Sequence, residues 1–296
     1  MIKVSVIIPA YNEEAAIFMT LKELQNNLTD EYEIIVIDDG SKDNTYDETK
    51  KMVGGIPEIR CIKHHVNRGY GSAIKSGVEA SVGEIVVWYD ADGQHRPEDL
   101  IGCVNTLIDN NLDYCIGVRD DRSFVDKNRR LGKRILAHLA NFMSREPIQD
   151  VNSGLRAFKK DVLERYLSLL PKRFGASTVT TFVMQEADCF GGSYPIVVRQ
   201  RIGTSTVRPF RDGMRTLWLI IWIILQFRPI QVFATSGVSF ILIGCIYGVI
   251  EAITEGEGIP VLAAILVIFG IQEFFFGIIS AQISSMRIDL LGHRVI

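Results

Sequence analysis

Two aspartates one residue apart follow an apolar stretch in the segment VVWYDADGQHRPEDL, residues 86–100. The carboxylates of Asp90 and Asp92 offer a hard oxygen site for a divalent cation, Mg²⁺ or Mn²⁺, which keeps several waters and takes further ligands from substrate phosphates. Such a cation would stabilise a departing diphosphate as a Lewis acid. Asp90 and Asp92 are therefore the predicted metal ligands.

Two more polar clusters follow predicted strands, at residues 9–13 (PAYNE) and 38–41 (DDGS). In a parallel sheet, ligands bind beyond the carboxyl ends of the strands, so all three clusters would share one edge. Each cluster alone fits a turn or a helix cap, but three at one edge favour a ligand site. The sequence contains no Gly-x-Gly-x-x-Gly after the first strand and no Walker loop, so a glycine-rich turn does not hold the phosphates.

The elements that must position these clusters alternate along the chain. Nearly continuous apolar runs, as expected for strands covered on both faces, predict strands at 4–10, 32–38, 59–64, 84–89 and 113–118. Helical spacing of apolar residues predicts helices at 13–28, 43–53, 71–82 and 97–111, with Pro97 in a first helical turn. The alternation predicts an α/β fold with a doubly wound, mostly parallel sheet.

The composition changes near Leu217, because charged residues nearly vanish beyond it. Two long apolar segments, about 229–250 and 259–286, are predicted to span a membrane, and a buried soluble helix is the alternative for each. The shorter segment before them carries Trp218 and Trp222 and favours an interfacial helix over a soluble one. We therefore expect a catalytic domain at 1–212, an interfacial helix at 213–228 and a two-helix membrane domain at 229–296.

Charge around the spans predicts their orientation. The connection EAITEGEG is acidic, whereas arginines precede the first span and follow the second, so both termini and the catalytic domain are expected in the cytoplasm. Glu273 interrupts the second span and faces lipid, a protein partner or a wet cavity. Small residues such as Gly237 and Gly244 permit close helix packing, which leaves a homo-oligomer open.

The overall charge, the cysteines and the N-terminal segment exclude some classes of protein but do not indicate a substrate. The chain has 296 residues, of which 47% are hydrophobic, and a net charge of −3, which says little about partners; we expect no nucleic-acid partner. Its five cysteines are scattered and lack Cys-x-x-Cys spacing, so neither a disulfide framework nor a zinc site is indicated. MIKVSVIIPA reads as the start of a strand and not as a secretion signal.

Several motifs together resemble a known family. VSVIIPAYNEE, VIDDGSKDNT, NRGYG and DADGQH resemble the GT-A nucleotide-sugar-binding domain of glycosyltransferase family 2, with residues 90–92 as its Asp-x-Asp motif. GVR, NRRLGKR, DVNSGLRAF and RIGTSTVRP further along resemble its polyprenyl-phosphate branch, which is similar to dolichol-phosphate mannose synthase and bacterial undecaprenyl-phosphate glucosyltransferases. The resemblance covers the whole part of the chain before the spans.

The resemblance implies roles for individual residues. The nucleotide-sugar donor would be bound by Pro9, Tyr11, Glu13, Asp39, Asp90, Ala91 and Asp92, and the catalytic set would be Asp90, Asp92 and Gln94, with Gln94 beside the reacting sugar. The lipid phosphate or the donor diphosphate would meet Arg119, Arg129, Ser153 and Arg201, with Arg130 and Lys133 as near alternatives. For each single arginine, a surface salt bridge is the competing interpretation.

Two departures from the branch pattern affect the acceptor and the sugar. The branch often has Gly-x-Ser-Lys where this chain has GTST, so Thr206 replaces a lysine, and Arg208 or Arg211 would supply the charge. Residues 175–187 carry threonines where some relatives have acidic residues, which suggests a different sugar.

The resemblance implies a membrane-bound enzyme that moves one sugar from a nucleotide-diphosphate sugar to undecaprenyl or dolichyl phosphate. UDP-sugars such as UDP-glucose are favoured over GDP-mannose, and the sugar is left open. The acceptor phosphate is largely anionic near neutral pH, so an inverting attack needs no general base. The rivals are a nonprocessive transferase to another lipid and a catalytically silent nucleotide-sugar sensor. A processive synthase is disfavoured because Gln-x-x-Arg-Trp is missing.

Overall fold

The computed structural model describes residues 3–55, 57–120, 123, 150, 153–173, 175–203, 218, 221–222, 225, 228–256 and 258–292. Contacts divide the chain into two compact units, Met1–Thr216 and Leu217–Ile296. The predicted interfacial helix at 213–228 lies mostly outside the described residues; Trp218 and Trp222, which are described, have exposed side chains.

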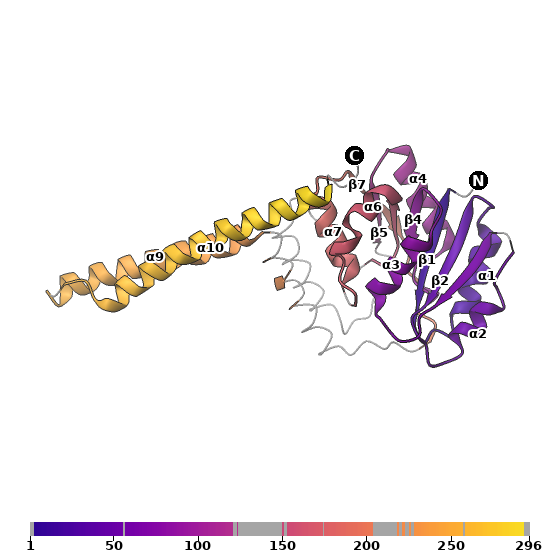
Figure 1. Ribbon diagram of the computed structural model, residues 1–296, viewed down its shortest axis with the longest axis horizontal. Coiled ribbons are helices and arrows are strands. Elements are labelled where there is room, and N and C mark those ends of the chain that lie inside the picture. The colour runs from indigo at the N-terminus through magenta and orange to yellow at the C-terminus, as the bar shows by residue number, and fades with distance from the viewer. Residues whose placement is uncertain are drawn as a thin grey trace. The chain divides into compact units, whose positions relative to one another are not determined.

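The first unit is built on one seven-stranded sheet with the order β3-β2-β1-β4-β6-β5-β7 (Figure 1). Its strands are β1 Val4–Ala10, β2 Tyr32–Asp38, β3 Glu58–Lys63, β4 Ile85–Trp88, β5 Tyr114–Arg119, β6 Arg156–Lys159 and β7 Gly191–Ile196. β6 runs antiparallel to both of its neighbours, and every other pairing in the sheet is parallel. The predicted doubly wound, mostly parallel α/β fold is therefore confirmed, with β6 as an antiparallel insertion.

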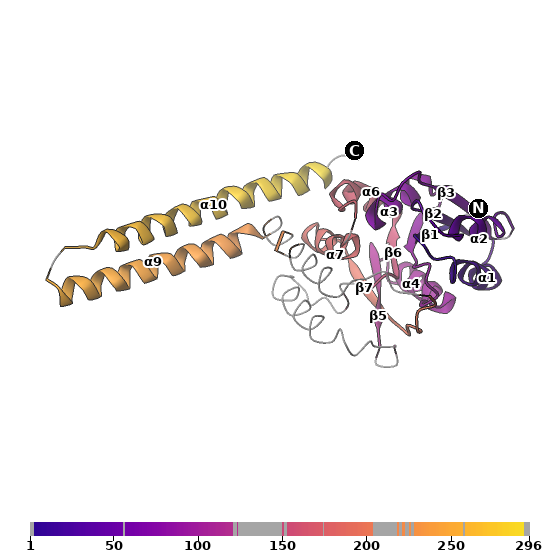
Figure 2. The same cartoon turned by 90° about the horizontal axis from the view of Figure 1, so that it is seen from below.

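Helices cover both faces of this sheet. They are α1 Ile17–Asn27, α2 Thr45–Lys50, α3 Tyr70–Ala80, α4 Pro97–Asp109, α6 Lys160–Tyr166, the 3-10 helix η2 Leu167–Leu169 and α7 Ala176–Glu186. In Figure 2, α3, α6 and α7 lie on one side of the sheet and α1 and α4 on the other. Successive strand residues point to opposite faces, so Val6 and Ile8 pack towards α1 and α4 while Ile7 contacts Gly77 of α3. This two-sided burial explains why the central strands are nearly continuous apolar runs.

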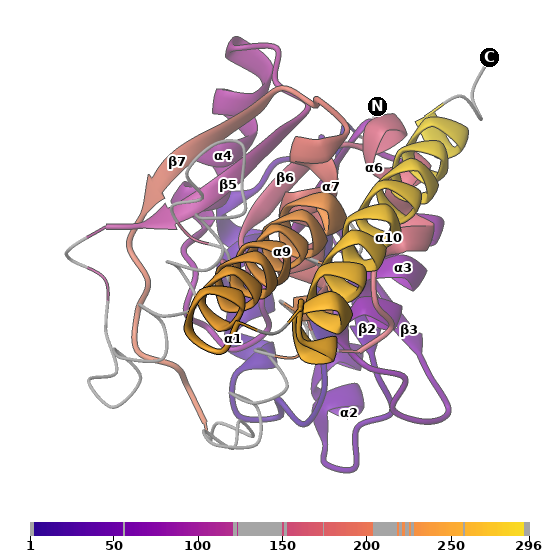
Figure 3. The ribbon, with the colours of Figure 1, turned by 90° about the vertical axis from the view of Figure 1, so that its left-hand side faces the viewer.

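The second unit contains two long helices that run side by side, α9 Pro229–Thr254 and α10 Val261–Gly292 (Figure 3). Residues Pro229–Thr254 and Val261–Met286 are long and apolar enough to cross a membrane. Most of their large apolar side chains are exposed, as a lipid-facing surface requires. These spans agree with the two segments expected from the sequence.

Glycines bring the two helices close together. A Cβ added to Gly237 would lie 2.6 Å from the carbonyl oxygen of Gly270, and one added to Gly244 would lie 3.0 Å from that of Ala263. Ser236 donates a hydrogen bond of 3.1 Å from its hydroxyl to the carboxylate of Glu273. Glu273 thus has a polar partner inside the hairpin, which limits the cost of a carboxylate within an apolar helix.

Candidate active site

A cavity of about 470 Å³ opens at the carboxyl ends of β1, β2 and β4. It brings together residues from all three polar clusters predicted from the sequence and one of the predicted arginines: Pro9, Tyr11, Glu13, Asp39, Asp90, Ala91, Asp92 and Arg201. In open α/β sheets this edge is where ligands bind, because the loops that follow the strands converge there.

The loops after β1 and β2 are locked to each other beside this cavity. Asn12 adopts a left-handed backbone conformation with φ of 55°, which asparagine tolerates better than most residues. Its N–H donates to the Ser41 hydroxyl at 3.0 Å, and its side-chain oxygen accepts from the N–H of Lys42 at 2.9 Å. The N–H of Glu13 donates to the Thr45 hydroxyl at 2.8 Å. These reciprocal bonds fix the positions of Tyr11 and Glu13.

Asp39 is buried at the end of β2 and accepts three hydrogen bonds within the protein. Its Oδ1 lies 2.7 Å from Nδ1 of His64 and accepts the N–H of Arg68 at 2.9 Å, and its Oδ2 accepts the N–H of Gly69 at 2.7 Å. The other ring nitrogen of His64 lies 2.9 Å from the Ser76 hydroxyl. The carboxylate is therefore held in one orientation at the cavity wall.

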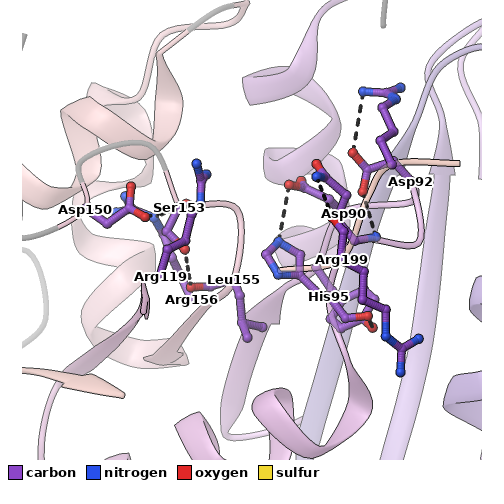
Figure 4. A network of polar contacts seen from close by, with 12 residues as sticks. Asp90, Asp92, His95, Arg119, Asp150, Ser153, Leu155, Arg156 and Arg199 are labelled. Carbon is purple, nitrogen blue, oxygen red and sulfur yellow. Dashed lines mark hydrogen bonds and ion pairs between the residues drawn. The ribbon is translucent and has the colours of Figure 1, made fainter. Parts of the chain in front are cut away.

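Asp90 follows β4 and is surrounded by polar groups. Its Oδ2 lies 3.5 Å from Nε2 of His95, towards which it points in Figure 4, and its Oδ1 accepts a hydrogen bond of 3.4 Å from the Tyr70 hydroxyl. Burial acts to raise the pKa of Asp90, but the hydrogen bond and charge of His95, with the charges of Arg119 and Arg201, outweigh it and hold this pKa below its ordinary value. Asp90 is therefore ionised near neutral pH.

Arg201 joins the two other acidic groups of the cavity. Its guanidinium pairs with the carboxylate of Glu13 and lies 3.4 Å from Oδ2 of Asp92. Burial, followed by the negative charge of Asp90, raises the pKa of Asp92. Burial also raises the pKa of Glu13 to about 7; Asp92 and Asp90 add to that rise and Arg201 opposes it. The cavity thus concentrates negative charge that a cation would relieve.

The Gln94 side chain binds a neighbouring segment of the chain. Its amide nitrogen donates to the carbonyl oxygen of Arg199 at 3.1 Å, and its backbone N–H donates to Oδ1 of Asp92 at 3.2 Å. The N–H of Arg199 returns a bond to the carbonyl of Gln94 at 2.9 Å, and that of Ile202 bonds the carbonyl of Asp92 at 3.1 Å. Gln94 thereby ties the segment that carries Arg201 to the aspartate pair.

Two of the predicted acceptor residues, Arg119 and Ser153, belong to a second group of polar contacts, which lies beside Asp90 and His95 (Figure 4). Arg119 ends β5, and its Nε lies 3.3 Å from a carboxylate oxygen of Asp150. Ser153 is fully buried; its carbonyl accepts a bond of 2.8 Å from the buried guanidinium of Arg156. Arg129, Arg130, Lys133 and Arg208 lie outside the described residues, as does Thr206.

The site contains residues that the sequence did not single out. Tyr70 and Arg173 line the cavity, His95 contacts Asp90, and Gly154 lies so close to Asp90 that an added Cβ would overlap its carboxylate. His95 belongs to the DADGQH motif and Tyr70 to NRGYG, so both were within reach of motif analysis. Both Gly154 and Arg173 lie more than 60 residues from Asp90 in the chain; Gly154 belongs to the DVNSGLRAF motif, whereas Arg173 lies outside every motif quoted above.

The sheet, its ligand edge and its paired aspartates define a GT-A glycosyltransferase. Residues 5–167 match the family Glycosyl transferase family 2, and residues 228–286 match the GtrB C-terminal hairpin. The chain therefore belongs to glycosyltransferase family 2, which confirms the resemblance seen in its motifs. With this hairpin and its two apolar helices, the protein is an integral membrane protein.

Two proteins similar to this chain have names that refer to a dolichyl phosphate and to bactoprenol. The chain is 33% identical over 211 residues to the UDP-N-acetylglucosamine–dolichyl-phosphate N-acetylglucosaminyltransferase of Methanococcus voltae, covering 64% of this chain and 83% of that one. It is 25% identical over 302 residues to a prophage bactoprenol glucosyl transferase homolog of Escherichia coli K12, covering 97% and 95%. The chain thus falls in the polyprenyl-phosphate sugar transferase group.

Solved structures show the same fold. Glucosyl-3-phosphoglycerate synthase from Mycobacterium tuberculosis, in complex with Mn²⁺, UDP and phosphoglyceric acid, superposes with a TM-score of 0.58 at 20% identity, covering 75% of this chain and 77% of that chain. The same enzyme with Mg²⁺ and UDP gives a TM-score of 0.57 at 21% identity, covering 75% and 78%.

Proposed function

We propose that the protein transfers a single sugar from a nucleoside-diphosphate sugar to the phosphate of a polyprenyl phosphate, with inversion at the anomeric carbon. The observation that carries this proposal is one cavity that combines Asp39, Asp90, Asp92 and Arg201 in a chain that also has a membrane hairpin. UDP-sugars such as UDP-glucose are the favoured donors over GDP-mannose, and undecaprenyl or dolichyl phosphate is the acceptor. The product is a lipid-linked monophosphate sugar for glycan assembly.

The residues present fit a divalent cation, Mg²⁺ or Mn²⁺. Asp90 is ionised, Asp92 stands two residues away, and the guanidinium of Arg201 already lies against Asp92, which shows that this carboxylate attracts positive charge. Among the described residues no three acidic, histidine or cysteine side chains form a ligand cluster, so Asp90 and Asp92 would hold the ion together with donor phosphates and water. When bound, the ion supplies Lewis-acid stabilisation of the leaving diphosphate.

The chain's own residues position the donor. Pro9, Tyr11, Glu13 and Asp39 line the cavity on the side of β1 and β2 and would bind the base and ribose, while Asp90, Ala91 and Asp92 lie at the end of β4 and would meet the diphosphate. Gln94 would stand beside the reacting sugar. Tyr70 and His95 hold the Asp90 carboxylate in place, so that no reorganisation is needed when charge develops on the leaving group.

The reaction needs no general base from the protein. α7 contacts Tyr70 through Ser177; it carries further hydroxyl side chains at Thr178, Thr180 and Thr181 and has no carboxylate before Glu186. A lipid monophosphate has a second pKa of about 6 and is largely a dianion at neutral pH. Its oxygen attacks the anomeric carbon, and the bond from that carbon to the donor phosphate oxygen breaks on the opposite face.

Basic side chains would hold the acceptor phosphate for this attack. We propose Arg119, Arg129, Arg130, Lys133, Ser153, Arg201 and Arg208 for the acceptor or the donor diphosphate. Arginine suits this role because its planar fork grips phosphate oxygens in pairs. Ser153 would act through its backbone position, since its side chain is buried.

We propose that the catalytic domain comprises 1–212, that 213–228 lies in the membrane interface, and that both termini face the cytoplasm. The acidic connection between the spans would then lie on the opposite side of the membrane.

A transfer assay tests the proposal. Full-length protein in lipid nanodiscs is incubated with Mn²⁺ or Mg²⁺, radiolabelled UDP-, GDP- or dTDP-sugars, and either polyprenyl phosphate or diacylglycerol. The expected result is a labelled lipid with polyprenyl phosphate alone. Labelled diacylglycerol would show that the acceptor is a different lipid. Binding of the nucleotide sugar without any labelled lipid would indicate a sensor.

A further inference from the structure

The two carboxylate oxygens of Asp92 have different partners. Its Oδ1 accepts the N–H of Gln94 at 3.2 Å, so this oxygen is bonded to the backbone of its own loop. Its Oδ2 lies 3.4 Å from Nη1 of Arg201. Only 9% of the Asp92 side chain is exposed, which restricts how a cation can approach it. A cation that binds Asp92 through Oδ2 therefore meets the guanidinium of Arg201 at the same oxygen.

The backbone on either side of Arg201 is bonded to the aspartate loop. The N–H of Ile202 donates to the carbonyl of Asp92 at 3.1 Å, and the N–H of Arg199 donates to the carbonyl of Gln94 at 2.9 Å. The backbone of Arg201 cannot move away from Asp92 unless these bonds break. Rotation of the Arg201 side chain is therefore the simplest way to separate its guanidinium from the carboxylate.

Glu13 is a second partner of the same guanidinium. Nη2 of Arg201 pairs with the Glu13 carboxylate, and the backbone N–H of Glu13 is held by the Thr45 hydroxyl at 2.8 Å. Ion-paired hydrogen bonds of this kind have N–O distances of about 2.7 to 2.9 Å, so the contact of 3.4 Å with Asp92 is the weaker of the two. Arg201 can thus give up Asp92 and stay bound to Glu13. Its Nε is buried and has no acceptor among the described residues, which leaves a donor for a ligand.

We propose that Arg201 competes with the divalent cation for Asp92, an inference that rests on the proposed function. Both groups are positively charged, and like charges so close together repel each other. Arg201 therefore lowers the affinity of the site for Mg²⁺ or Mn²⁺ alone. Glu13 maintains the competition, because it keeps the guanidinium beside Asp92.

A nucleoside diphosphate changes this competition. Its phosphate oxygens accept hydrogen bonds from a guanidinium, so Arg201 can exchange Asp92 for the diphosphate while it stays paired with Glu13. The negative charge of the diphosphate also offsets the two positive groups. The cation and the nucleotide therefore strengthen each other's binding, by the same factor in both directions. Arg201 thus makes the site select a metal–nucleotide complex over the free metal ion.

Mn²⁺ binding with and without nucleotide tests this inference. Full-length protein in phosphatidylcholine nanodiscs is titrated with Mn²⁺, alone and with UDP or GDP, and free Mn²⁺ is measured by electron paramagnetic resonance. The wild type is compared with Arg201→Gln, Arg201→Lys and Arg199→Gln. Arg199→Gln is the matched control, because it removes the same charge two residues away, where the guanidinium binds Glu23 outside the cavity. Asp92→Asn identifies the Mn²⁺ that binds at this site.

Arg201→Gln is expected to bind Mn²⁺ alone about tenfold more tightly than the wild type and to gain about tenfold less from the nucleotide. Arg201→Lys should stay close to the wild type, because lysine keeps a positive charge beside Asp92, and so should Arg199→Gln. A misfolded variant would lose affinity, so misfolding cannot produce the expected gain. Unchanged or weaker Mn²⁺ binding in Arg201→Gln, or an equal gain in Arg199→Gln, would overturn the inference.

Failure of the proposed function would give a different result. Mn²⁺ binding that Asp92→Asn left unchanged, both with and without nucleotide, would show that the aspartate pair is not the metal site. The proposed metal site and the competition at Asp92 would then both be wrong.

Discussion

Gly154 packs directly against the carboxylate of Asp90. A side chain at position 154 would overlap the carboxylate oxygens, so only glycine fits between the turn before β6 and the metal-binding aspartate we propose. Arg156 holds this turn in place. Its buried guanidinium donates to the carbonyl of Ser153 at 2.8 Å and to the hydroxyl of Thr181 at 2.6 Å. The orientation of Asp90 is thus set partly by a segment more than 60 residues later in the chain.

Gly154→Ala is therefore expected to displace Asp90 and to lower the rate of sugar transfer by about 100-fold, because a shift of about 1 Å in a reacting geometry costs that much. The measurement is transfer to polyprenyl phosphate at saturating donor, together with Mn²⁺ affinity by titration. Gly258→Ala, where the added methyl group meets open space, is the control. Wild-type rates in Gly154→Ala would show that Asp90 tolerates the shift.

Removal of the metal should abolish transfer. Asp92→Asn deletes one of the two proposed ligands, and we expect it to lower transfer by about 100-fold or more, as does the loss of other groups that stabilise developing charge. Chelation by EDTA should have the same effect on the wild type and be reversed by Mn²⁺ or Mg²⁺. Full activity of Asp92→Asn, or of the chelated enzyme, would refute the assignment of the metal site.

Glu13 gives a pH dependence to the stability of the metal-free protein. Because its pKa in the folded state is about 7, above the ordinary 4.5, the folded state holds a proton that the unfolded state has lost between these values. Stability conferred by this group is present below about pH 4.5 and is lost as the pH rises towards about 7. Glu13→Gln should therefore be more stable than the wild type at about pH 8 and similar to it at about pH 4.5.

Thermal unfolding of the full-length protein in detergent, without metal or nucleotide, measures this difference. Each pKa unit corresponds to about 1.4 kcal/mol, so the gain is limited to a few kcal/mol. Glu14→Gln is the control, since its neighbouring carboxylate is exposed. A constant difference between Glu13→Gln and the wild type across this pH range would contradict the assignment.

Glu33 should act in the opposite direction. It is buried in β2 and accepts bonds from the Ser5 hydroxyl, the N–H of Val82 and the guanidinium of Arg60. Burial acts to raise the pKa of Glu33, but these three partners outweigh it and lower the pKa below 4.5. The stability that Glu33 confers is thus present above about pH 4.5 and is lost as the pH falls through its folded pKa.

Glu33→Gln is expected to cost about 1 to 3 kcal/mol near neutral pH, since it weakens a buried charged network. The difference from the wild type should shrink as the pH falls towards about 3. Denaturant unfolding of both proteins at several pH values measures the cost near neutral pH and its decrease at low pH. A cost that did not change with pH would mean that the carboxylate charge contributes nothing.

The membrane hairpin depends on the contact between Gly237 and Gly270. A Cβ at Gly270 would lie 2.5 Å from the carbonyl oxygen of Gly237 and 3.0 Å from the backbone nitrogen of Ile241. Gly270→Leu should therefore separate α9 from α10 and cost about 1 to 3 kcal/mol by overpacking. The control is Ile271→Leu, since Ile271 is exposed on the outer surface of the hairpin. In detergent, Gly270→Leu should lower the midpoint temperature of thermal unfolding, and Ile271→Leu should leave it unchanged.

The central strands were predictable because they are buried on both faces. The sequence predicts strands at 4–10 and 32–38, which are the bounds of β1 and β2, and both are nearly continuous apolar runs, interrupted by Ser5 in β1 and Glu33 in β2. β6 and β7 were missed. β6 has only four residues and includes the buried Arg156, while β7 reads GGSYPI, which has neither alternation nor a β-branched run. Their places in the sheet are set by neighbouring strands and not by their own composition.

The site was predictable to the extent that its residues follow strands. Asp39, Asp90 and Glu13 come after β2, β4 and β1, so the sheet alone brings them to one edge. Arg173 and Gly154 enter the site through contacts with α3 and Asp90 that link distant parts of the chain. Gly154 lies in the DVNSGLRAF motif, but the motif alone does not indicate its contact with Asp90, and Arg173 lies in no motif.

The sheet order also constrains when this enzyme can become active during its synthesis. β6 lies between β4 and β5 although the ribosome makes it after both, and Arg201 joins the cavity later still. Contacts between residues so far apart in the chain slow folding, because a long loop must close before each contact forms. A nascent chain therefore lacks the full sheet until β7, which ends at Ile196, has been synthesised, and it lacks the full cavity until Arg201 has been added. Translation has by then almost reached the first apolar helix, so folding of the catalytic unit and delivery of the hairpin to the membrane fall within the same short interval.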